Sequence, residues 1–181
     1  MNRLLPAAIA AAVLVLAGCA SPDPAAQFLE THELDGLSGK ELVEQLDTSS
    51  QPRPLPYVAS VREDEVLLGD ESTEVSVALP DDEFYLSIAP FVETTHECYY
   101  HSLATCQGEM VEQDVTVPIT DDAGAVLVDE AATTYPNGFV GFWVPRNISG
   151  TIEVTAGDLS GSVPFGSSDG DPTCITTLQL S

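Results

Sequence analysis

The chain has few basic residues: 5 Lys and Arg stand against 29 Asp and Glu in 181 residues, a formal net charge of −24. Nucleic-acid binding needs clustered Lys and Arg to release the counterions of the phosphates, so nucleic acid is excluded as a partner. Adhesion to anionic lipid head groups is disfavoured on the same ground. The acidity favours solubility, and its field concentrates cations near the surface.

Several catalytic and metal-binding motifs are also missing. The chain has no Gly-rich phosphate loop, no His-Glu-x-x-His and no Cys-x-x-Cys pair. These absences remove the nucleotide-binding P-loop, the common zinc-protease helix, and the usual zinc-ribbon and thioredoxin signatures. A site made of cysteine and histidine ligands must therefore use a less familiar spacing of these residues.

No apolar run near the N-terminus is long enough for a membrane span. Arg3 precedes a short run rich in Ala, Leu and Val, and Leu16-Ala17-Gly18-Cys19 follows, which resembles the lipobox of bacterial lipoproteins. Residues 1–18 are predicted to be a lipoprotein signal peptide, Cys19 the lipidated residue, and 19–24 a tether linker. The protein is then exported and lipid-anchored at the outer face of the cytoplasmic membrane, or on the periplasmic side in a cell with two membranes.

Cysteine is scarce, and its count is informative. The chain has four cysteines, and lipidation of Cys19 leaves Cys98, Cys106 and Cys174. Three is an odd number, so at least one thiol cannot pair within the chain in an oxidising compartment. A leftover thiol in an exported protein indicates intermolecular pairing, metal ligation or redox chemistry.

The periodicity predicts a mainly β protein with a small N-terminal helical module. Residues 25–50 show helical patterns, including the capping-box spacing of Ser38 and Glu41, and 51–56 form a Pro-rich connector. From residue 57 to 181 the pattern alternates with a period of two between Gly, Asn and Asp turns. This part is predicted to be a β-rich metal-binding domain built as an antiparallel β-sandwich.

Residues 96–106, HECYYHSLATC, concentrate the soft ligands of the chain. If the segment is extended there, His96 and Cys98 point to the same face, while His101 and Cys106 follow shortly after. Thiolates and imidazoles select Cu(I) or Zn(II), and Cys174 could complete the site. The competing interpretation is a structural disulfide between Cys98 and Cys106 with an inert Cys174.

Four stretches together resemble the CueP family of exported bacterial copper-resistance proteins; they are 95–98 (THEC), 101–106 (HSLATC), 138–143 (GFVGFW) and 172–174 (PTC). The resemblance implies that Cys98, Cys106 and Cys174 are the functional, redox-active cysteines and that His96 and His101 are further ligands. It also implies copper binding, reduction of Cu(II) to Cu(I), supply of copper to a Cu,Zn superoxide dismutase, and a homodimer formed through the N-terminal module. The lipobox departs from the familiar soluble members of the family.

The sequence thus predicts an extracytoplasmic copper-binding lipoprotein with a three-cysteine site, in which zinc could substitute for copper. The thiols would also make it a possible Cu(II) reductase. Two alternatives from other classes remain open. One is a metal-independent thiol oxidoreductase, and the other is a scaffolding lipoprotein stapled by a disulfide.

Overall fold

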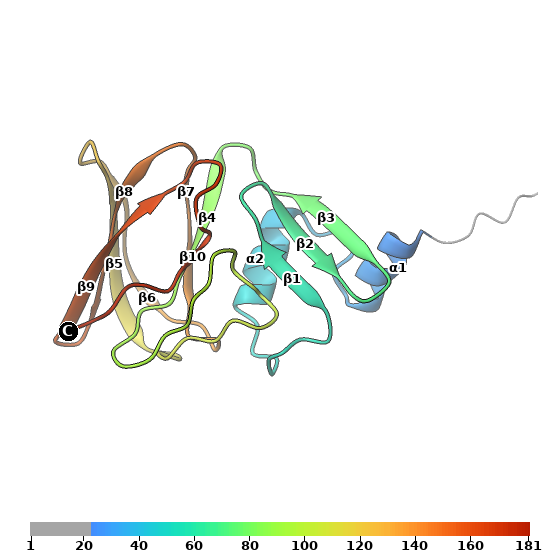
Figure 1. Cartoon of the computed structure of the whole chain (residues 1–181), viewed down its shortest axis with the longest axis horizontal. Helices are drawn as coiled ribbons and strands as arrows, with labels where there is room; N and C mark the ends of the chain where they lie inside the picture. Colours follow the sequence, from blue (N-terminus) through green and yellow to red (C-terminus); the bar gives the residue numbers. More distant parts are fainter. Residues whose placement is uncertain (1–22) are drawn as a thin grey trace, which may run out of the picture.

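The computed structural model describes residues 23–181, and the predicted signal peptide, the Cys19 lipobox and most of the tether linker lie outside them. The described part contains two short helices near its N-terminus followed by ten strands in three sheets (Figure 1). The predicted fold class, mainly β with a small helical part, is confirmed. No helix among residues 23–181 is long and apolar enough to cross a membrane.

Local capping explains where the two helices begin. Helix α1 spans Pro24–Thr31, and the Asp23 carboxylate accepts a hydrogen bond from the backbone of Ala25. Helix α2 spans Gly39–Asp47 and has the capping box anticipated from its sequence. The Ser38 hydroxyl accepts from the backbone N–H of Glu41 at 3.3 Å, and the Glu41 carboxylate accepts from the backbone N–H of Ser38 at 2.8 Å.

The helices do not form a core of their own. They share one with the antiparallel sheet of β1 (Val58–Val61), β2 (Glu65–Gly69) and β3 (Glu74–Ala78), whose strand order is β1-β2-β3. Leu42 and Val43 are completely buried in this core. Helices of eight and nine residues are marginal in water. Burial of their apolar faces against the sheet therefore accounts for their stability.

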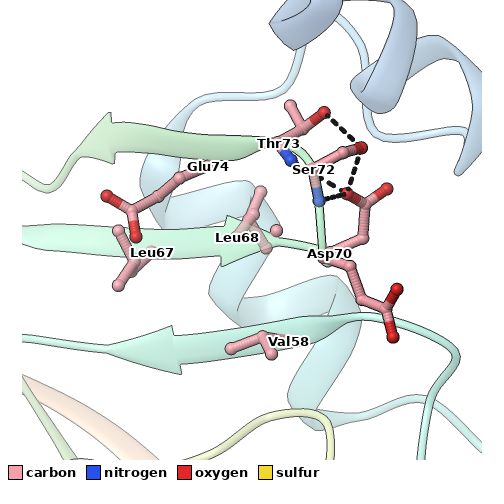
Figure 2. A pocket seen from close by; sticks show the side chains of 9 residues that line it. Val58, Leu67, Leu68, Asp70, Ser72, Thr73 and Glu74 are labelled. Carbon is pink, nitrogen blue, oxygen red and sulfur yellow. Dashed lines mark hydrogen bonds between the residues drawn. The ribbon is translucent and has the colours of Figure 1, made fainter.

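The turn between β2 and β3 is held by one side chain. Asp70 Oδ1 accepts hydrogen bonds from the backbone N–H groups of Ser72 at 2.8 Å and Thr73 at 2.9 Å, as Figure 2 shows. The pocket beside this turn has a volume of about 330 Å³, and neither Cys nor His lines it. The turn therefore has a structural role and is not part of the soft-ligand site predicted for this chain.

The second core lies between two sheets that face one another (left side of Figure 1). One sheet has the order β10-β4-β7 and the other β6-β5-β8-β9. The first is formed by β4 (Glu83–Ile88), β7 (Val140–Pro145) and β10 (Cys174–Ile175), and the second by β5 (Asp114–Asp121), β6 (Val126–Thr133), β8 (Ser149–Ala156) and β9 (Leu159–Gly166). The predicted sandwich is therefore present.

One strand pair corrects the expectation of a purely antiparallel sandwich. Strand β10 runs parallel to β4, with Cys174 opposite Ser87 and Ile175 opposite Ile88. The backbone N–H of Ser87 donates to the Thr173 carbonyl, and that of Ala89 donates to the Ile175 carbonyl, both at 2.9 Å. Because β10 follows a crossover from the other sheet, it can enter beside β4 in the same direction.

We expect Leu42→Ala to lower the free energy of unfolding by about 2–5 kcal/mol, because it leaves a cavity between α2 and the first sheet. Val126→Ala is the control, since Val126 is 63% exposed, and it should change stability by about 0.5 kcal/mol or less. Urea unfolding followed by far-UV circular dichroism measures both. Equal stability of the two variants would contradict the shared core.

Candidate metal centre

The soft-ligand segment lies in the long connection between β4 and β5, where it passes between the first sheet and the sandwich (yellow-green in Figure 1). On one side, the backbone N–H of Val61 in β1 donates to the His101 carbonyl at 2.8 Å. On the other side, the backbone N–H of Cys174 in β10 donates to the Tyr99 carbonyl at 3.1 Å. The segment is thus fixed from both sides of the molecule.

Two side chains, the exposed Glu109 and the buried Thr173, shape this connection further. The Glu109 carboxylate accepts hydrogen bonds from three successive backbone N–H groups, at residues 92, 93 and 94. The Thr173 hydroxyl accepts from the backbone N–H of His101 at 3.0 Å and donates to the Val61 carbonyl at 2.8 Å. Glu109 thus joins the two ends of the connection, and Thr173 fixes its middle at His101, so the side chains of residues 96–106 are held close to one another.

All five residues predicted for the site come together, in two overlapping sets. His96, Cys98 and Cys106 form one set, and His101, Cys106 and Cys174 form the other. Within each set the ligand atoms lie within 4.8 Å of one another. The third histidine, His32, belongs to neither set and packs instead against Phe28 and Tyr57 in the first core.

The three thiols are free. Cys98 Sγ and Cys106 Sγ lie 3.5 Å apart, well beyond the S–S bond length of about 2.05 Å. The structural disulfide considered from the sequence is therefore not formed here. The contact is nevertheless close enough for the two sulfurs to bind one metal ion or to be oxidised to a disulfide.

Cys106, which both sets share, is the most acidic of the three thiols. Hydrogen bonding from the Cys174 and Cys98 thiols lowers the pKa of Cys106 far below that of a free thiol, against the opposing effect of burial, and His101 lowers it further. Conversely, the hydrogen bond with Cys106 raises the pKa of Cys98 to about 11, and the pKa of Cys174 also rises for that reason. At neutral pH Cys106 is therefore the thiolate, and the Cys98 and Cys174 thiols donate hydrogen bonds to it.

His101 is held by a hydrogen bond to an acidic residue that the sequence interpretation did not single out. Asp47, the last residue of α2, is completely buried, and its Oδ1 lies 2.9 Å from His101 Nε2. With Nε2–H donating to the carboxylate, Nδ1 faces the thiols and lies 3.7 Å from Cys174 Sγ. A carboxylate behind a ligand histidine fixes the ring orientation and makes its other nitrogen a better ligand.

The Asp47 carboxylate also accepts hydrogen bonds from Asn137 Nδ2 and from the Tyr85 hydroxyl, both at 2.6 Å, and from the Ser87 hydroxyl at 3.3 Å. One signal for Asp47 was present in the sequence. It follows Val43 by four residues, which places an acid on the buried apolar face of α2. Acids are rarely buried completely unless they are paired.

Charge pairing decides the protonation of this buried pair. Burial alone would lower the pKa of His101, but the Asp47 carboxylate outweighs it and raises the pKa to about 9. Burial alone would likewise raise the pKa of Asp47, yet His101 and the hydrogen-bond donors keep it below its ordinary value. The metal-free site therefore holds a buried imidazolium between a carboxylate and a thiolate.

His96 and Cys98, the two half-buried residues of the five, border a surface pocket. Its volume is about 450 Å³, and its lining includes Phe91, His96, Cys98 and Thr176. The Nε2 atom of His96 is buried and has no hydrogen-bond partner among the described residues. One nitrogen of this ring also lies within 4.8 Å of the Cys98 and Cys106 sulfurs, so a soft metal ion fits in this position.

Residues 41–179 match the family described as "Periplasmic copper-binding protein CueP". The chain belongs to the CueP family. A solved structure, described as the crystal structure of S.CueP, is similar to this chain with a TM-score of 0.86 and 41% identity, over 90% of this chain and 100% of that one. No curated protein sequence matches the chain.

Family membership explains why soft ligands converge in an acidic β protein. The family is described as copper-binding and periplasmic, in agreement with the copper and the extracytoplasmic location expected from the sequence. The donor set of this CueP protein, sulfur and imidazole nitrogen, suits copper as Cu(I).

We expect metal-free, reduced protein to carry one thiolate at pH 7, because the pKa of Cys106 is strongly lowered while those of Cys98 and Cys174 are raised. Thiolate absorbance at 240 nm, compared between pH 7 and acid, should detect it. Cys106→Ser should abolish the signal, and His32→Gln is the control that should leave it unchanged. A thiolate that titrates only above pH 8 would contradict the assignment.

We expect Asp47→Ala to lower the free energy of unfolding by about 3–5 kcal/mol near pH 7, because it leaves His101 and its neighbours buried without their partner. The raised pKa of His101 stabilises the fold fully below its unfolded value of about 6.5, and this contribution is lost as the pH rises through about 9. The destabilisation in the variant should therefore shrink between pH 6.5 and 9.

The matched control is Glu83→Gln, which breaks the Lys40–Glu83 ion pair, 2.6 Å long and about one-third exposed. An exposed pair contributes about 1 kcal/mol or less, so this variant should differ little from the original protein. Urea unfolding at several pH values compares the two. An Asp47→Ala effect as small as that of the control would show that the buried pair is not a stabilising contact.

Proposed function

We propose that this protein binds Cu(I) outside the cytoplasm through Cys98, Cys106 and Cys174, with His96 and His101 as further ligands. The observation that carries the proposal is the convergence of three free thiols and two imidazoles in two sets whose ligand atoms lie within 4.8 Å of each other. Thiolates and imidazoles select soft ions such as Cu(I), and Zn(II) is the expected substitute. Membership of a copper-binding family supports the choice of copper.

A second part of the proposal is that the same thiols reduce Cu(II). Cys98 and Cys106, 3.5 Å apart, would form a disulfide and release two electrons, which reduce two Cu(II) ions to Cu(I). Cys106 reacts as the thiolate, while the Cys98 thiol loses its proton to solvent as the S–S bond forms. The redox-active cysteines would then have to be re-reduced by an external thiol before the next cycle.

The cellular setting is proposed from the sequence. Lipid on Cys19 would anchor the protein to the membrane, and the N-terminal module would form a homodimer. The recipient of the copper would be an exported cuproenzyme such as a Cu,Zn superoxide dismutase. An anchored donor cannot diffuse freely, so the recipient would have to reach the membrane surface.

We expect reduced protein to withdraw Cu(I) from a chromophoric chelator such as bicinchoninate, and the Cys106→Ser, Cys174→Ser double variant to bind at least about tenfold more weakly because two sulfur ligands are lost. Absorbance of the chelator complex measures the competition. His32→Gln, which changes the histidine outside both sets, is the control and should bind like the original protein.

Unchanged affinity in the double variant would overturn the proposal. The remaining alternative with a distinct signature is a thiol oxidoreductase without a metal function. Sustained turnover of a peptide disulfide or of peroxide in chelator-treated buffer, together with absent Cu(I) binding, would establish that alternative instead.

A further inference from the structure

The structure assigns this protein two successive Cu(I) stations within its three-cysteine site. We infer that His96, Cys98 and Cys106 form an outer station that receives Cu(I), and that His101, Cys106 and Cys174 form an inner station that retains it. Cys106 belongs to both and carries the ion from one to the other. The inference rests on the proposed Cu(I) binding and adds a route to it.

The first argument is geometric. Metal–sulfur bonds of about 2.3 Å allow two sulfurs on the same ion to be at most about 4.6 Å apart. Among residues 23–181, neither set of ligand atoms within 4.8 Å of one another contains both Cys98 and Cys174. As the side chains lie before metal binding, an ion in either set contacts only one of these two sulfurs, whereas Cys106 is within reach from both sets.

The second argument is the difference in burial. His96 and Cys98 are half-buried and line the surface pocket, so an ion from outside can reach them directly. His101 is completely buried and Cys174 is 3% exposed, so the inner set is far less open to solvent than the outer one. Cys106, 7% exposed, lies between the two. An ion reaches the inner station by way of the outer one.

The third argument concerns how firmly each imidazole is held. His101 is anchored through Nε2 by Asp47, so its Nδ1 is oriented toward the inner sulfurs before any ion arrives. The Nε2 atom of His96 has no partner among the described residues. Pre-oriented ligands bind a metal more tightly, so the inner station is the tighter of the two.

Transfer between the stations is a ligand exchange in which the ion keeps its bond to Cys106. The bonds to Cys98 and His96 break as bonds to Cys174 and His101 form. The Cys174 thiol and His101 Nδ1 lose one proton each; the Cys98 sulfur takes one, solvent takes the other, and Cu(I) keeps its oxidation state. Because Cys98 and Cys106 are 3.5 Å apart, the exchange needs only small side-chain movements. The ion is bound throughout and is never released into water.

The test compares one variant of each station, Cys98→Ser and Cys174→Ser, by stopped-flow transfer of Cu(I) from bicinchoninate and by equilibrium competition. Cys98→Ser should slow loading by about tenfold or more while the final affinity stays within about threefold. Cys174→Ser should load at the initial rate of the original protein but retain Cu(I) at least about tenfold more weakly. His96→Gln should reproduce the slow loading without touching a sulfur.

Histidine ring NMR provides a readout independent of rates, since Cu(I) is diamagnetic. In Cys98→Ser only the His101 resonances should shift on addition of Cu(I), and in Cys174→Ser only those of His96. If Ser at the buried position 174 disturbs folding, Cys174→Ala serves in its place. Circular dichroism of each variant verifies the fold.

Equal losses of rate and affinity in both variants, or shifts of both histidines in each, would overturn the two stations and leave a single shared site. These outcomes differ from failure of the proposed function. In that case the original protein itself would not withdraw Cu(I) from the chelator.

Discussion

The buried carboxylate of Asp47 is the contact on which both the fold and the metal centre depend. It accepts hydrogen bonds from four side chains: His101 and Asn137 in connections, and Tyr85 and Ser87 in β4. A fully desolvated carboxylate is costly unless its oxygens are satisfied and a positive charge is near. Here both conditions hold, so the carboxylate fixes the relative positions of the elements that supply its partners.

This contact joins the two cores. Asp47 is the final residue of α2, which packs in the first core, whereas His101, Asn137 and β4 border the sandwich. Arg53 strengthens the junction, because its guanidinium donates to the Leu46 carbonyl at 3.0 Å and to the Leu103 carbonyl at 3.3 Å. It thereby caps the end of α2 and holds the connection that contains His101 and Cys106. The N-terminal helices are thus part of the metal centre's framework, although they contribute no ligand.

The sequence was informative where the signal is local. Soft ligands close together in residues 96–106, the capping box at Ser38 and the alternation of the strands predicted the site segment, a helix start and the mainly β fold. The parallel pairing of β10 with β4 and the role of Asp47 depend on contacts between residues 38 to 90 positions apart. The periodicity of the sequence carries no information on such contacts. The oxidation state of the thiols could not be predicted from the sequence either, because it depends on the sulfur–sulfur distances in the folded protein and on the redox conditions in solution.

The charges around His101 determine which protons a metal ion must displace at the inner site. Before metal binding, the inner site holds the Asp47 carboxylate, the His101 imidazolium and the Cys106 thiolate, with Cys174 still protonated because its pKa is raised. Cu(I) bound to His101 Nδ1, Cys106 and Cys174 would displace the Nδ1 proton and the proton of the Cys174 thiol, so metal binding would release protons. Zn(II) in the same place would displace the same two protons and add one more positive charge, so the charges of the inner site do not exclude it. The choice of copper therefore rests on the softness of the sulfur and imidazole ligands and on the family description.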